Sequence, residues 1–421
     1  MSDSIDQLYA DYRANTSRDR DPQLLAALDA KPGQAAVLVE RLFLDLPNHS
    51  SLLETALLGL APEEFAPLAL KAVTTLRRDP CHDAAQDFVS HTSLQALPAL
   101  HTHLQELFYL QPNWTTYYAM WPWRETGASE FAFLQRHAGS GTTFWEGGPS
   151  RTTQRAALEA LFETRAFEIL QFLEGRLNPE DFQHRARDIG MESSAAGYTR
   201  LYSEQPFHIS FPAGYFDGIP FPSGSLPMPG LEVQDLHLPQ QHTFGGEGTG
   251  ECLGCHQRLV NLLTLNSIPP GLGVTGLRRL SLQVCFSCLD LGMLFYEHDH
   301  LGNTCEASQS KREAAGRMED CGPLRPATVH LIRTPARWRW QDWGVSNSRE
   351  NLNRLGGHPA WVQGADYPAC PQCRQAMIHL LQLDSDLPLH DGGEWLWGSG
   401  GCGYVSWCDR CKISAVHSQC T

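Results

Sequence analysis

Eight of the thirteen cysteines in this 421-residue chain form Cys-x-x-Cys pairs. The two residues between the cysteines of a pair allow both sulfurs to face one metal ion, and two such pairs can supply the four thiolates of a tetrahedral zinc site. The spacing therefore predicts two four-cysteine sites. The first contains Cys252, Cys255, Cys285 and Cys288, and the second contains Cys370, Cys373, Cys408 and Cys411.

The distances along the chain indicate what each site encloses. The gap between the paired motifs is 29 residues in the first site and 34 in the second, so each gap is long enough for a hairpin or more. We expect two closed, all-thiolate zinc sites with a structural rather than a catalytic role, because all four positions are filled by protein. Cys402, His417 and Cys420 are possible substitute ligands in the second site, and we expect Cys81, Cys305 and Cys321 to be free.

The segments around the two sites resemble each other. Gly245-Gly246 precedes the first site and Gly356-Gly357 the second, and an apolar stretch ending in serine follows the first cysteine pair of each, over residues 259–267 and 377–385. The period is about 118 to 123 residues, longer than solenoid repeats. We infer an internal duplication of a mostly β domain, with one metal site in each copy.

The first part of the chain has a different pattern. Apolar residues recur every three or four positions in residues 1–110 and again in 151–177, which predicts helices. Ala61-Pro62-Glu63-Glu64 is typical of a helix start, with proline in the first turn and carboxylates at its positive end. Several short helices with short connections suggest a loosely HEAT-like stack. The predicted fold is therefore α+β, with an α-helical domain over residues 1–178, a first β copy over 179–302, and a linker with the second copy over 303–421.

Composition limits the class of partner. The formal charge is −15, and acidic residues exceed basic ones both before and after residue 178. This charge disfavours direct binding to nucleic acid or an anionic membrane, and it favours a basic protein partner. The N-terminal residues lack the basic and apolar regions of a signal peptide, and no apolar run is long enough to span a membrane. We therefore expect a cytoplasmic protein whose cysteines bind metal rather than form disulfides.

Three other motifs suggest competing chemistry. Cys252-Leu-Gly-Cys255-His256 matches a c-type haem attachment pattern, but haem attachment requires export and the second site has Arg374 at the histidine position. His298 and His300 form a His-x-His pair that could belong to a metal hydrolase, without an evident acidic partner. Residues 333–343 alternate arginine and tryptophan, which could stack on single-stranded nucleic acid, but a linker between the copies fits the acidic charge better.

The C-terminal motifs resemble a known family. Leu355-Gly-Gly-His-Pro-Ala-Trp-Val-Gln363, Leu380-Leu-Gln-Leu-Asp-Ser385, Trp397-Gly398 and Gly401-Cys-Gly-Tyr404 are similar to motifs of the YwqG-like bacterial proteins, whose biochemical function is unknown. Coverage is good over residues 350–421, thinner over 195–302, and absent over 1–178. The resemblance implies a mostly β, internally duplicated fold.

The resemblance also implies a function. Some YwqG-like proteins resemble immunity proteins that neutralise type VI or other polymorphic toxins. This chain therefore looks like a cytoplasmic immunity protein that binds a basic protein toxin, plausibly a nuclease effector, without catalytic residues of its own. Two alternatives remain open: a metal-dependent enzyme of unidentified activity, and a zinc-ribbon regulatory or interaction protein.

Overall fold

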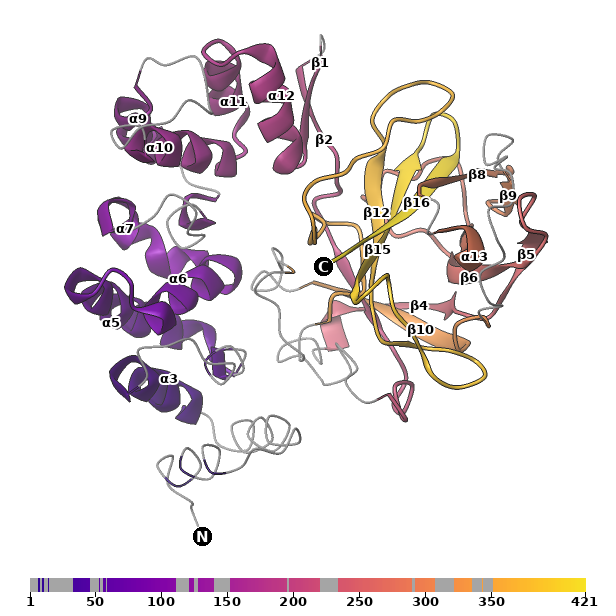
Figure 1. Cartoon of the computed structure of the whole chain (residues 1–421), viewed down its shortest axis with the longest axis horizontal. Coiled ribbons are helices and arrows are strands. Elements are labelled where there is room, and N and C mark those ends of the chain that lie inside the picture. Colours follow the sequence, from indigo (N-terminus) through magenta and orange to yellow (C-terminus); the bar gives the residue numbers. More distant parts are fainter. Residues whose placement is uncertain are drawn as a thin grey trace. The chain divides into compact units, whose positions relative to one another are not determined.

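The computed structural model describes two compact units, which divide between Ile189 and Gly190 (Figure 1). Besides a few single positions, the described residues are 33–45, 59–110, 121–124, 128–139, 152–194, 197–219, 234–289, 292–306, 322–334 and 351–421. The first unit is helical, and the second contains both cysteine-rich copies. The chain is therefore a mixed α+β protein.

Short helices make up the described part of the first unit. The α-helices are α3 (Gln34–Asp45), α5 (Phe65–Arg78), α6 (Asp83–Gln95), α7 (Leu104–Leu110), α9 (Ala128–His137), α10 (Thr152–Glu163), α11 (Phe167–Glu174) and α12 (Pro179–Asp188). The 3-10 turns are η1 (Pro62–Glu64), η2 (Leu97–His103) and η3 (Trp121–Trp123).

The apolar periodicity of the sequence corresponds to the helical core. Phe65, Leu68 and Leu76 on one face of α5 are buried against neighbouring helices. The predicted helix start is confirmed, because Glu64 Oε2 accepts a hydrogen bond from Ala61 N at 2.7 Å. The helical unit continues beyond residue 178 through α12, and the HEAT-like comparison stays a prediction.

One large antiparallel sheet dominates the second unit. Its strands are β3 (Phe207–Ser210), β4 (His237–Phe244), β5 (Glu247–Glu251), β6 (Arg258–Leu265), β7 (Leu280–Val284), β8 (Leu294–His298), β9 (Thr304–Glu306), β10 (Ala327–Arg333), β11 (Arg354–Leu355), β12 (Ile378–Asp384), β15 (Gly401–Cys408) and β16 (Ile413–Cys420). Two small hairpins, β1 (Met191–Ser194) with β2 (Gly197–Arg200) and β13 (Leu387–Pro388) with β14 (Glu394–Trp395), lie outside it. A short helix, α13 (Phe286–Leu289), and a 3-10 turn, η5 (Gln234–Leu236), complete the described elements.

The strand order shows how the two copies combine. From β7 to β15 the order is β7-β6-β4-β10-β3-β11-β12-β15, and β16, β8 and β9 follow. Here copy 1 denotes β3 to β8 and copy 2 denotes β10 to β16. Equivalent strands of the two copies occupy mirror positions, while β10 and β3 are each paired with the other copy. The two ends of the order approach each other, because Thr304 Oγ1 donates to Ser281 O at 2.6 Å, so the sheet is nearly closed.

The ladder irregularities repeat between the copies as well. In β6 the register shifts between Asn261 and Leu263, and in β12 it shifts between His379 and Leu381. The bulged residue therefore lies at the same place of the repeat. This repetition is what an internal duplication predicts.

The Gly-Gly motifs have a backbone role in both copies. Gly245 has a φ of +67° and Gly356 a φ of +69°, in the left-handed region that favours glycine. A Cβ at Gly245 would lie 2.3 Å from the carbonyl oxygen of Arg325. Only glycine can therefore occupy this position without moving the chain.

No helix among the described residues is long and apolar enough to cross a membrane.

Candidate metal centres

The structure brings together the two groups of four cysteines that the spacing predicts. In each group, all four sulfur atoms lie within 4.8 Å of one another. The sulfur–sulfur distances are 3.7 Å for Cys252–Cys288, 3.4 Å for Cys255–Cys285 and 3.6 Å for Cys373–Cys408. A disulfide requires about 2.05 Å, whereas four sulfurs at about 2.3 Å from one zinc ion lie about 3.8 Å apart in a tetrahedron. The geometry therefore fits metal binding and not disulfide formation.

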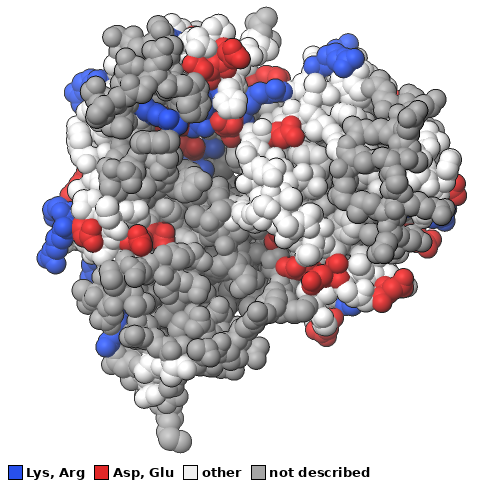
Figure 2. All heavy atoms as spheres, in the orientation of Figure 1, with Lys and Arg blue, Asp and Glu red and all other residues white. Residues whose placement is uncertain are grey.

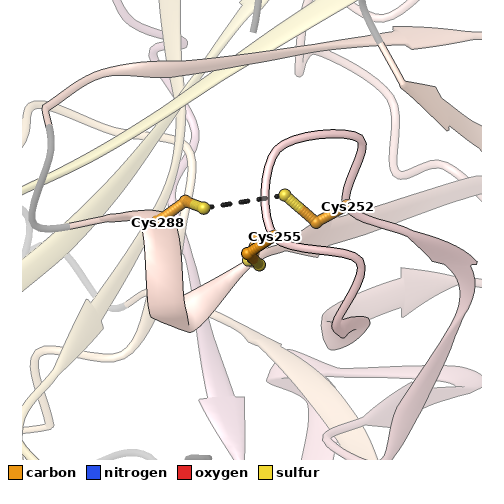
Figure 3. Close-up of side chains that lie close together, drawn as sticks. Cys252, Cys255 and Cys288 are labelled. Atoms are coloured by element: carbon orange, nitrogen blue, oxygen red, sulfur yellow. Dashed lines mark hydrogen bonds between the residues drawn. The ribbon is translucent and has the colours of Figure 1, made fainter. Parts of the chain in front are cut away.

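Strands and turns position the ligands. Figure 3 shows Cys252 and Cys255 on one tight turn, facing Cys288 on α13. The turn is closed by two backbone hydrogen bonds, from His256 N to Cys252 O and from Cys252 N to Gln257 O, both 2.8 Å. Copy 2 repeats this pattern around Cys370. In each gap a β-ladder, β6 with β7 or β12 with β15, returns the chain to the second cysteine pair, as the gap lengths predict.

The electrostatics of the first group favour a bound cation. A hydrogen bond from the Cys285 thiol lowers the pKa of Cys252 to about 4. Burial and the negative charge of Cys252 raise the pKa of Cys288 to about 12. Four thiolates in one place repel one another, and a divalent cation removes that conflict by stabilising all of them. Metal binding should therefore release protons and weaken as the pH falls.

The first group is part of the main core of the β unit. Cys252 and Cys285 are buried in the same apolar cluster as Leu259 and Val284. Phe286, between the cysteines of the second pair, stacks on Trp395 of copy 2, with ring centroids 3.7 Å apart. A metal at this centre would hold β6, β7 and α13 together.

The second group lies where the copies meet. Cys370 and Cys408 form a small apolar cluster that includes Met293 and Phe295 of copy 1. Directly after Cys411, β16 pairs with β8 of copy 1 over four residues. This β8–β16 ladder is called the seam below.

Polar contacts reinforce the seam beside the second group. Asp409 Oδ1, between the last two cysteines, accepts hydrogen bonds from Thr275 N at 2.8 Å and Lys412 Nζ at 2.7 Å. Although burial opposes ionisation, the hydrogen bonds from Lys412 and Thr275 hold the pKa of Asp409 at about 2. Gln372 Nε2 donates to Glu297 Oε1 of β8 at 3.0 Å. The turns of the second centre are thus tied to copy 1, which sequence spacing alone did not indicate.

The possible substitute ligands lie outside both groups. Cys402 is buried, and its sulfur lies 3.6 Å from Asp384 Oδ1. His417 and Cys420 do not join the second group either. Cys81 and Cys305 are exposed free thiols, and Cys321 lies outside the described residues.

Among the described residues, the structure forms no metal-ligand group at the competing motifs. His298 is buried on β8 with Nε2 2.9 Å from Ser414 Oγ, while His300 is exposed, and neither belongs to a group of metal ligands among the described residues. His256 has a φ of +60° and Arg374 a φ of +63°, so the histidine of the haem-like motif occupies the same turn position as an arginine in copy 2. Most of residues 333–343 lies outside the described part of the chain.

Sequence reasoning missed a second set of polar residues, on β12, β15 and β16. His379 and Gln382 lie within the apolar stretch 377–385, yet both are buried. The sequence feature that could have revealed them is the presence of polar side chains at strand positions where the pattern is otherwise apolar.

The buried His298 predicts acid sensitivity. Burial lowers its pKa to about 4, against about 6.5 for an exposed histidine. The unfolded chain therefore binds this proton at higher pH, so the contribution of the neutral imidazole is complete above about pH 6.5 and is lost as the pH falls toward 4. The total is about 3 kcal/mol, with about 2 kcal/mol lost by pH 5.

A substitution isolates this effect. His298→Gln retains a hydrogen-bonding group for Ser414. When the pH falls from 7 to 5, the free energy of unfolding of this variant should decrease by about 2 kcal/mol less than that of the original chain. Hydrogen exchange of β8 measures this, with metal content checked at each pH. The exposed His300→Gln is the control, and identical pH dependence of His298→Gln and the original chain would contradict the assignment.

Comparisons with known proteins give little functional information. No family model matches the chain, and no solved structure matches it. A segment of 71 residues is 41% identical to the uncharacterized protein YpfL of Salmonella typhimurium, covering 17% of this chain and 15% of that protein. The chain thus matches less than a sixth of the length of this relative.

Proposed function

We propose that this chain is a non-enzymatic binding protein, held in shape by two structural zinc ions, that neutralises a cognate protein toxin. The observation that supports the structural role is that each candidate centre brings four cysteine sulfurs close together. A catalytic zinc needs an open position for water or substrate, and four protein thiolates leave none. Zinc is the metal that such closed tetrahedral thiolate sites most commonly hold, and iron is the alternative.

The acidic charge supports a basic partner. At −15, the chain would attract a nuclease that carries a positive phosphate-binding face, and the attraction would speed association at low salt. Figure 2 shows acidic and basic side chains interspersed on the described surface of one face, so no single region of that face is assigned to the partner. The toxin class rests on the YwqG-like resemblance of the C-terminal motifs.

One preparation can test both parts of the proposal. The full chain, purified from its native cells, should contain about two zinc ions by elemental analysis, the number that two four-cysteine centres hold. Mass spectrometry of the same sample should identify a basic, secreted partner. Co-expression of this chain should then relieve the toxicity of that partner, and a stoichiometric excess should inhibit its activity in vitro.

The outcomes separate the two claims. If a captured toxin remains fully active with an excess of this chain, the immunity function is contradicted, but the proposed zinc centres are not. Fewer than one metal ion per chain in a folded sample contradicts the centres. Raising the salt from 50 to 500 mM should slow association at least about tenfold if charge steers the encounter.

A further inference from the structure

Copy 2 carries a cluster of four rings that the metal centres do not use. His379 of β12, Tyr404 of β15 and His417 of β16 gather around Trp361, which follows the second Gly-Gly motif. The Trp361 ring centroid lies 4.6 Å from Tyr404, 6.2 Å from His379 and 6.1 Å from His417. These four residues are called the ring cluster.

The strands hold Trp361 over the sheet through polar side chains. Gln382 Oε1 accepts from Ala360 N at 2.7 Å, and Tyr404 OH donates to Ala360 O at 2.8 Å. On the other side of Trp361, Gln419 Oε1 accepts from Val362 N at 3.1 Å. The position of Trp361 is therefore fixed from three strands.

Several polar atoms in the ring cluster are buried without a hydrogen-bond partner. They are Nδ1 of His379, both ring nitrogens of His417, and Nε1 of Trp361. His379 is 1% exposed and His417 6% exposed. Buried polar atoms in proteins are normally hydrogen-bonded to protein, water or ligand. Four such nitrogens on three neighbouring rings are unusual, and a bound molecule that hydrogen-bonds to them would account for them.

Copy 1 shows that the fold does not require such a cluster. The ladder positions of His379 and Tyr404 correspond to Asn261 and Ser281 in copy 1. There, Thr264 Oγ1 donates to Asn261 Oδ1 at 2.8 Å and contacts Ser281 Oγ at 3.2 Å. Small side chains thus satisfy one another in copy 1, whereas copy 2 places large rings with unpaired nitrogens. The difference indicates a specialised role for copy 2.

The ionisable groups around the ring cluster determine how the two imidazoles respond to a bound anion. Burial, the positive charge of Arg354 and the neighbouring His417 hold the pKa of His379 well below its usual range. Burial also lowers the pKa of His417, while Asp366 Oδ2, 3.8 Å from His417 Nε2, opposes this from a half-exposed position. The other ionisable groups that adjoin Tyr404 are Cys402 and Asp384. Both imidazoles are therefore neutral near pH 7, and a bound anion would favour their protonation as the pH falls.

We propose that the ring cluster binds a small oxyanion, a carboxylate or a phosphate, whose oxygens accept hydrogen bonds from Trp361, His379 and His417. The indole Nε1 can only donate, so its partner must be an acceptor. A metal cation is disfavoured, because the ring-cluster residues do not form a group of metal ligands; among the described residues only the two cysteine groups do. This inference does not depend on the toxin or on zinc.

The test uses the full, zinc-loaded chain with ¹⁵N-labelled histidine. Inorganic phosphate and acetate are titrated separately at pH 8 and pH 6, with chloride at matched ionic strength, and the His379 and His417 nitrogens are followed by NMR. We expect saturable shifts and an affinity that increases up to about tenfold per pH unit for each proton taken up with the anion. Phosphate alone, acetate alone, or both would identify the kind of oxyanion bound.

A conservative variant adds a check that does not rely on histidine. Trp361→Phe keeps a ring but removes the donor, and it should weaken anion binding at least about tenfold, as loss of a hydrogen bond to a charged group does. The exposed His300→Gln is the control and should bind like the original chain. If neither anion causes a saturable shift at pH 6, or if Trp361→Phe binds as the original chain does, the proposal is wrong. Ordered water would then be the hydrogen-bond partner of these nitrogens.

Discussion

Replacing Cys408 with serine should abolish metal retention at the second centre and destabilise the β unit by more than about 4 kcal/mol, the range reached when a structural metal is lost. The change removes one of the four cysteine sulfurs, so the remaining three no longer complete a tetrahedral metal site. Because the second centre packs on Met293 and Phe295 of copy 1, the seam should open along with it.

Hydrogen exchange of β8 and β16, together with elemental analysis, measures this effect. Cys305→Ser is the matched control, because Cys305 is exposed and outside both groups, and it should change stability by less than about 0.5 kcal/mol. Cys288→Ser should release the metal of the first centre and expose mainly β6, β7 and α13. If Cys408→Ser retained two metals and normal protection at the seam, the second centre could not have the assigned role.

Gly245→Ala should be one of the most damaging single changes outside the cysteines. A Cβ at this position would lie 2.3 Å from the Arg325 carbonyl oxygen, and the φ of +67° is unfavourable for alanine. Left-handed backbone alone costs about 1–2 kcal/mol. Because the contact is with rigid backbone between β4 and β10, we expect a total loss above about 3 kcal/mol.

A second glycine separates the two causes. Gly271 has a φ of +89°, but no atom lies within 4 Å of a Cβ built there. Gly271→Ala should therefore cost only the backbone term of about 1–2 kcal/mol. Denaturant unfolding followed by hydrogen exchange of the β unit measures both variants. Equal losses for the two variants would show that close approach to Arg325 is not what requires glycine at Gly245.

The sequence predicted the features that depend on local pattern. Cysteine spacing identified both four-cysteine groups, and apolar stretches identified β6 and β12 to within two residues. The end of the helical unit was harder to predict, although the sequence contains a helix-start signal there. Asn178 caps α12 by accepting a hydrogen bond from Asp181 N at 2.9 Å, and Pro179 occupies the first turn, which together mark one more helix after residue 178.

Features that depend on pairing between distant residues could not be predicted. The spacing assigned one metal site to each copy, but it did not show that β10 pairs with β4 or that β16 pairs with β8. Strand order depends on which edges meet in space, and alternating apolar residues carry no information about the neighbour. The ring cluster was missed for the same reason, because His379 and His417 are far apart in sequence.

The exchange of strands between copies has a consequence for how the protein folds. β3 finds its partners only after β10 and β11 exist, more than a hundred residues later, so copy 1 cannot complete its pairing when it emerges first. Such distant contacts form slowly and leave strand edges exposed in the meantime. A second chain nearby offers the same edges as the missing copy, so crowded synthesis favours dimers that have exchanged copies. Dilution during refolding should therefore raise the yield of monomer.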